Sequence, residues 1–250
     1  MKAISRILAL VLVLALALAI VPATAEEAPQ RGGTVTIAFP ASLTNIGFPV
    51  AGGVQPLWAS KPAIEMLARY DENGQIKGWL AKEILVDTDN LEVTLKLQEG
   101  VKYHDGTPFN AQAVCDVWQI YIDNGSASAY FGNVDSFEAT GEYEVKVKLN
   151  EWRTSTVGNL CIECGVMISP TEFKRVGLEG IYGSVVGTGP FKMSRYDIAE
   201  GIEYVRNEDY WIEGQPYLDG INILFFTEES TGENIFNTGD AQVIFGVSAN

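Results

Sequence analysis

Two short stretches of strict apolar–polar alternation constrain the fold of this chain most. In residues 91–97 and again in residues 143–149, every second side chain is apolar, and the side chains between them are Glu, Thr or Lys. A period of two places one face of a β-strand in a core and the other face in water. We therefore expect two half-buried antiparallel strands that pair with each other.

The segment between these strands carries the pattern of a capped helix. Asn110 is a residue type that accepts a backbone N–H at a helix start. An apolar stripe follows at helical spacing, formed by Val114, Val117, Trp118 and Tyr121. Pro62 suits the first turn of another helix, which we expect to run to about Tyr70. Residues 61–178 thus predict a compact α+β unit.

A second group of strands lies outside this unit. Residues 34–39 alternate and are rich in β-branched side chains, which predicts a strand. Residues 191–196 and 201–206 predict a hairpin that follows a tight turn at Gly187-Thr188-Gly189-Pro190. We expect that turn to be structural, at the point where the chain leaves the α+β unit.

The last part of the chain alternates strand, helix and strand. Strands are expected at residues 218–226 and 241–246. The helix between them should begin at Thr227, with Glu228 and Glu229 near its positive end. This order favours a parallel crossover, so the fold class is α/β, of mixed α+β composition.

The N-terminus has the three parts of a secretory signal peptide. Lys2 and Arg6 precede an apolar run at residues 7–21, and Ala23-Thr24-Ala25 offers a small-x-small cleavage site. The run is short of the roughly 20 residues that span a membrane. We expect residues 1–25 to be removed and residues 26–33 to form a disordered tail.

The charge of the chain limits its partners. The net charge of −15 becomes −17 when Lys2 and Arg6 leave with the signal peptide. Nucleic-acid phosphates require Lys and Arg, so a nucleic acid is a poor candidate partner. After residues 7–21, no apolar run in the sequence is long enough to span a membrane.

Three cysteines, Cys115, Cys161 and Cys164, leave their redox state open between free thiols and one disulfide. Cys161-x-x-Cys164 has the spacing of a redox site, but its thiols would need a helix N-terminus, and residues 157–168 look strand-like. His104 is the only histidine and lies in a turn, where a structural role is expected. We expect no catalytic residue, no metal and no cofactor.

Four stretches together carry a resemblance to a known family. They are residues 80–97, G-V-K-Y-H-D-G-T-P at 100–108, V-G-T-G-P-F at 186–191 and N-E-D-Y-W at 207–211. In this order they resemble the family 5 extracellular solute-binding proteins of ABC transporters, the oligopeptide-, dipeptide- and nickel-binding class. Ala113 departs from the acidic residue usual at the helix start, so only half of that cap is expected.

The resemblance implies a periplasmic-binding-protein-like class II fold of two lobes. Residues 34–60 and 179–250 would form parts of the first lobe, and residues 61–178 an inserted subdomain. The second lobe would be missing, so that the chain is an N-terminal fragment truncated at Asn250.

The resemblance also implies a function and a site. A secreted, monomeric binding protein would capture a peptide or similar small solute in an interlobe cleft and deliver it to a membrane permease. The implied ligand contacts are Gly52, Gly53 and Val54 in the long loop at residues 40–60, together with Tyr130.

Two alternatives stay open. Within the same family, the ligand could be an oligosaccharide, an opine or a nickel complex, with Trp58 and Tyr130 as stacking surfaces. From a different class, the chain could be an extracytoplasmic thiol oxidoreductase that uses Cys161 and Cys164.

Overall fold

The two alternating stretches form the centre of a four-stranded antiparallel sheet in the computed structural model, which describes residues 29–48, 54–124 and 130–246. Its strands are β5 (Ala81–Asp87), β6 (Glu92–Leu97), β7 (Val134–Gly141) and β8 (Glu144–Leu149), in the order β5-β6-β8-β7. Val93 lies opposite Val147 and Leu95 opposite Val145, and these side chains are buried. The predicted strand pair is therefore confirmed.

Helix α4 (Ala111–Asp123) packs against β7 and β8 with the predicted apolar face. Asn110 caps it, since its side-chain oxygen accepts a hydrogen bond of 2.9 Å from the Ala113 N–H. The structure thus confirms the predicted half-cap. The four stripe residues are buried, namely Val114, Val117, Trp118 and Tyr121.

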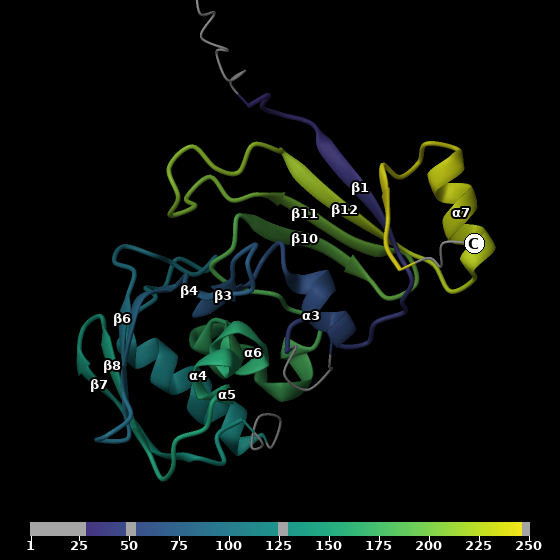
Figure 1. Cartoon of the computed structure of the whole chain (residues 1–250). Helices are drawn as coiled ribbons and strands as arrows, with labels where there is room; N and C mark the ends of the chain where they lie inside the picture. Colours follow the sequence, from purple (N-terminus) through teal and green to yellow (C-terminus); the bar gives the residue numbers. More distant parts are fainter. Residues whose placement is uncertain (1–28, 49–53, 125–129, 247–250) are drawn as a thin grey trace, which may run out of the picture. The chain divides into compact units, whose positions relative to one another are not determined.

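A five-stranded mixed sheet takes its strands from both ends of the described chain (Figure 1). The strands are β1 (Thr34–Phe39), β10 (Phe191–Asp197), β11 (Gly201–Arg206), β12 (Gly220–Phe225) and β13 (Val243–Ile244), in the order β10-β11-β12-β1-β13. Both β12 and β13 run parallel to β1, one on each side of it.

The connection between β12 and β13 contains helix α7 (Glu229–Asn237) and crosses past β1. This confirms the predicted parallel crossover. The predicted cap at Thr227 is wrong, because the N-cap residue is Glu228 and its side chain makes no capping hydrogen bond.

The helix predicted from Pro62 to Tyr70 is also wrong. Helix α3 (Val54–Ser60) ends before Pro62, and β2 (Glu65–Met66) and β3 (Ala68–Tyr70) follow it, with β3 pairing to β4 (Ile76–Gly78). The carbonyls of Pro62 and Ala63 accept hydrogen bonds of 3.0 Å from the N–H groups of Phe191 and Gly189. These long-range bonds hold the segment extended against its local helix preference.

Residues 157–168 are mostly not a strand, contrary to expectation. They contain the end of α5 (Ser155–Gly158), two short 3₁₀ turns, η1 (Asn159–Cys161) and η2 (Glu163–Gly165), and the two-residue strand β9 (Val166–Met167), which pairs with β2. Helix α6 (Pro170–Ile181) follows and is interrupted at Gly177. The apolar character of this stretch reflects burial within turns rather than a sheet.

One cluster of buried apolar side chains joins the two larger sheets, from Phe39 and Ile223 to Leu95 and Val147. These elements belong to one compact unit, residues 31–250. The predicted boundaries at residues 60/61 and 178/179 stay a prediction. Within the described residues, none of the helices has the length and apolar character needed to cross a membrane.

Candidate functional site

The Gly187-Thr188-Gly189 turn is held by a buried carboxylate, Glu65, at the start of β2. Thr188 Oγ1 donates to Glu65 Oε2 at 2.8 Å. The same carboxylate accepts hydrogen bonds from the Trp79 and Trp211 indoles, at 2.7 and 2.9 Å, and from the Tyr210 hydroxyl at 2.7 Å. Four donors from three segments therefore meet on one side chain.

The Glu65 carboxylate has no free acceptor position with which to bind a ligand. Burial raises the pKa of Glu65, while the hydrogen bonds from Trp211, Tyr210, Thr188 and Trp79 act in the opposite direction. A buried carboxylate needs such donors to avoid a large desolvation cost. The four bonds saturate it, so this cluster is a structural joint between β2, the glycine turn and the aromatic pair at 210–211.

The glycines of the turn are required by a close approach of backbones. A Cβ at Gly187 would lie 2.2 Å from the Ala63 carbonyl oxygen, and one at Gly189 would lie 2.7 Å from the Ala63 carbonyl carbon. His104 fixes the turn from another side, because its Nε2 lies 2.9 Å from the Gly189 carbonyl oxygen. Burial lowers the pKa of His104 to about 4, so the neutral ring donates through Nε2 at pH 7. These contacts give His104 a structural role.

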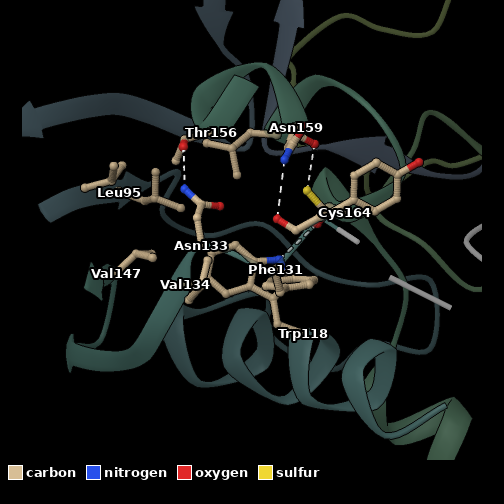
Figure 2. Close-up of a pocket in the computed structure, with 12 residues that line it drawn as sticks. Leu95, Trp118, Phe131, Asn133, Val134, Val147, Thr156, Asn159 and Cys164 are labelled. Carbon is tan, nitrogen blue, oxygen red and sulfur yellow. Dashed lines mark hydrogen bonds between the residues drawn. The ribbon is translucent and has the colours of Figure 1, made fainter. Parts of the chain in front are cut away.

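Tyr130, a predicted ligand contact, lies at the rim of a small apolar cavity of about 40 Å³. Figure 2 shows Trp118, Phe131, Val134 and Leu95 around this cavity, with Asn133 hydrogen-bonded to Thr156. The Tyr130 carbonyl accepts a hydrogen bond of 3.3 Å from the Asn159 side-chain amide. The cavity holds at most a few waters, so it is not a cleft for a peptide.

The other predicted contacts are Gly52, Gly53 and Val54, which are consecutive in the sequence. Gly52 and Gly53 fall outside the described residues, and Val54 is the first residue of α3. No hydrogen bond or ring contact among the described residues joins Tyr130 to Trp58. The structure therefore does not bring the two predicted stacking residues into contact with each other.

An exposed aromatic cluster lies where strands β1 and β13 end. Phe245 follows β13 and stacks on Phe39, the last residue of β1, with ring centroids 5.2 Å apart. Trp58 of α3 packs against Phe245 at 5.5 Å, and Lys61 Nζ lies 3.9 Å from the centre of the Trp58 ring. Trp58 and Phe245 are 43% and 39% exposed, so the cluster presents aromatic surface to solvent.

The same edge of the sheet carries a hollow of about 360 Å³ beside the ends of β1 and β12. It is lined by Ala41, Ser42, Ile198, Ala199, Phe225, Phe226, Thr227 and Thr231. In open α/β sheets, ligands bind outside the carboxyl ends of parallel strands. This edge is therefore the best candidate for the ligand-facing surface.

Sequence reasoning identified Trp58 but missed Lys61 and Phe245. Lys61 follows Trp58 at a spacing of three residues, which is a usable signal for contact at the end of a helix. The predicted helix begins at Pro62 and therefore excludes both Trp58 and Lys61, so it gives no reason to expect this contact. Phe245 meets Trp58 only through the sheet topology, and no local pattern reveals that contact.

The three cysteines are free and buried. Burial raises the pKa of Cys115 and of Cys161 to about 11 and also raises the pKa of Cys164. A reactive thiol requires the opposite shift. The structure therefore gives no support to a thiol oxidoreductase. Within the described ranges, no group of three or more His, Cys, Asp or Glu side chains could hold a metal ion.

Known proteins resemble the chain in sequence. Residues 75–250 match the family model described as bacterial extracellular solute-binding proteins, family 5 Middle. The glutathione-binding protein GsiB of Pectobacterium atrosepticum is 29% identical over 240 residues, which cover 82% of this chain and 46% of that relative.

Solved structures resemble the chain in fold. DppA of Helicobacter pylori, a periplasmic binding protein in complex with the peptide STSA, aligns with a TM-score of 0.76 and 21% identity, over 87% of this chain and 47% of its own. NikA of Brucella suis, in complex with Fe(III)-EDTA, gives a TM-score of 0.74 and 24% identity, over 84% and 42%. The chain spans less than half the length of each of these proteins. The likenesses confirm the predicted fold class.

Proposed function

Because the chain belongs to family 5 of the bacterial extracellular solute-binding proteins, we propose that it serves an ABC importer by capturing a peptide or a similar small solute. Family membership also confirms the predicted location outside the cytoplasm, periplasmic or extracellular. The relatives are binding proteins by name, in agreement with a role in capture rather than catalysis.

The mechanism that we propose is closure of two lobes around the ligand. The described chain would supply one wall of the cleft, at the edge where β1, β12 and β13 end, with Tyr130 as a further contact. The single observation that carries the proposal is the family match over residues 75–250. Gly52, Gly53 and Val54 stay predicted contacts. A membrane permease would be the partner, and the binding protein would act as a monomer.

Isothermal titration calorimetry of the secreted protein tests this function. The first ligands are glutathione, because the sequence relative is named for it, and a tetrapeptide, because one structural relative holds one. We expect saturable 1:1 binding to at least one peptide. Binding only to an oligosaccharide, an opine or a nickel complex would replace the peptide by that ligand, and binding to none of them would refute the proposal.

A further inference from the structure

Most basic side chains in the described part of the chain are ion-paired. Lys82 pairs with Glu99 at 2.7 Å, and Lys96 pairs with Glu83 at 2.8 Å. Lys61 differs, because no carboxylate of a described residue lies within ion-pair distance of it. Its ammonium is held instead over the Trp58 ring, 3.9 Å from the centroid.

The other described cations without an ion pair lie elsewhere. Arg31 donates to the Gly214 carbonyl at 2.6 Å, and Arg69 lies over Trp79, beside the Glu65 joint. Lys102 is exposed in an isolated bridge to Pro108. Among these residues, Lys61 alone lies beside the cluster formed by Trp58, Phe245 and Phe39 at the ends of β1 and β13.

The chemistry of Lys61 favours an anionic partner. An ammonium has three donors and no acceptor. Desolvation lowers the pKa of Lys61, although its side chain stays partly exposed. A carboxylate placed at this ammonium would supply the missing acceptor in a partly desolvated setting, where a charge-assisted hydrogen bond is strong.

The support of Lys61 is rigid. Ser60 Oγ donates to the Pro56 carbonyl at 2.7 Å, and the Tyr204 hydroxyl donates to the Ala59 carbonyl at 2.8 Å. These two bonds fix the last turn of α3 to itself and to β11. A fixed backbone under the lysine lowers the ordering cost of binding.

We propose that Lys61, held over the Trp58 ring, binds a carboxylate group of the captured solute. The inference rests on the proposed function and adds to it the chemical class of the ligand, a solute with a free carboxylate such as a peptide with an unmodified C-terminus. The neighbouring ring of Phe245 would cover an apolar part of the same ligand.

Nuclear magnetic resonance of the full chain tests this proposal through the indole N–H signal of Trp58. The probes are trialanine and its C-terminal amide, together with glutathione and its diethyl ester. We expect the free acids to shift the Trp58 signal and to bind about tenfold more tightly than the blocked forms. Lys61→Gln should remove that preference, and Lys61→Arg should largely retain it.

Lys102→Gln is the matched control, because it removes another exposed lysine that has no ion pair to a described residue. It should leave the preference for the free acid unchanged. Equal binding of free and blocked peptides, or a preference that survives Lys61→Gln, would overturn the carboxylate inference and leave the proposed function standing. Absence of binding to all four probes and to the wider set of solutes would overturn both.

Discussion

Thr188 Oγ1 donates to Glu65 Oε2 at 2.8 Å, although 123 residues separate the two in the sequence. This bond ties the glycine turn before β10 to β2. The same carboxylate holds the Trp79, Tyr210 and Trp211 side chains. The joint therefore adds a polar connection to the apolar cluster that joins the two larger sheets.

Glu65→Gln should destabilise the fold. The new amide has one oxygen in place of two, and its NH₂ group would face donors that need an acceptor, so we expect a loss of about 2–4 kcal/mol in the free energy of unfolding. Urea denaturation followed by circular dichroism measures it. Glu83→Gln is the control, since the 49% exposed Glu83 side chain makes a surface ion pair with Lys96, and this substitution should cost less than about 1 kcal/mol. Equal losses of unfolding free energy in the two variants would contradict the structural role that we assign to Glu65.

Gly187→Ala tests the close approach of the turn to Ala63. A Cβ at this position would lie 2.2 Å from a backbone oxygen that cannot move freely. We expect a destabilisation of about 1–3 kcal/mol from the forced backbone shift. In Gly183→Ala, the new Cβ would meet the Tyr196 ring at ordinary contact distances, 3.8 Å from Cδ1 and 3.9 Å from Cε1, so the unfolding midpoint should stay close to that of the parent. Unchanged stability in Gly187→Ala would show that the turn can open without cost.

The lowered pKa of His104 predicts that the stability of the fold depends on pH. Burial, and to a smaller extent the charge of Lys192, lower the pKa of His104 to about 4 from 6.5, although the Gly189 hydrogen bond and the charge of Asp105 act in the opposite direction. The unfolded chain therefore binds the proton first as the pH falls. The contribution of neutral His104 to the free energy of unfolding is complete above pH 6.5. It is lost progressively between pH 6.5 and 4, by up to about 3 kcal/mol.

The measurement compares the parent with His104→Gln, whose amide can still donate to Gly189. Unfolding free energies at several pH values between 4 and 7 should converge toward low pH, because only the parent loses the histidine contribution. Carboxylates titrate in both proteins and cancel in the difference. Parallel curves would show that His104 titrates alike in the folded and unfolded chain.

The sequence predicted correctly those elements whose structure depends on the local pattern of apolar residues. The alternation at residues 91–97 and the stripe after Asn110 led directly to β6 and α4, because burial on one face fixes the period. Pro62 misled the prediction, since the carbonyls of Pro62 and Ala63 bond to Phe191 and Gly189, far along the chain. Tertiary hydrogen bonds overrode a weak helix preference there.

The candidate site was less accessible to sequence reasoning. The donors to Glu65 lie 14 to 146 residues away from it, so no window of sequence contains them. Phe245 reaches Trp58 only because β13 pairs with β1. The pairing of two strands at opposite ends of the described chain is a property of the topology, and a single sequence carries no local signal for it.

The cysteines should be slow to react in the folded chain. At pH 7, a thiol with a pKa of about 11, as for Cys161, is about one part in 10⁴ thiolate. We expect iodoacetamide to alkylate the native protein at least about tenfold more slowly than free glutathione. The same protein in guanidinium chloride is the control, in which all three thiols should react. Rapid alkylation of Cys161 in the native state, or reduction of insulin, would reopen the oxidoreductase interpretation.

Tyr130 remains a proposed ligand contact, and its ring and hydroxyl can be tested separately. If the ring packs on the solute, Tyr130→Ala should lower the affinity for the bound peptide about tenfold, while Tyr130→Phe should retain most of it. Tyr217→Ala is the control, because Tyr217 is a 41% exposed tyrosine that lies beside Arg31, whose guanidinium bonds to Gly214. Calorimetry gives the affinities, and the melting temperature separates a binding effect from loss of the packing that Tyr130 makes against the core. Full affinity in Tyr130→Ala would remove this residue from the site and leave the wall formed by Trp58, Lys61 and Phe245.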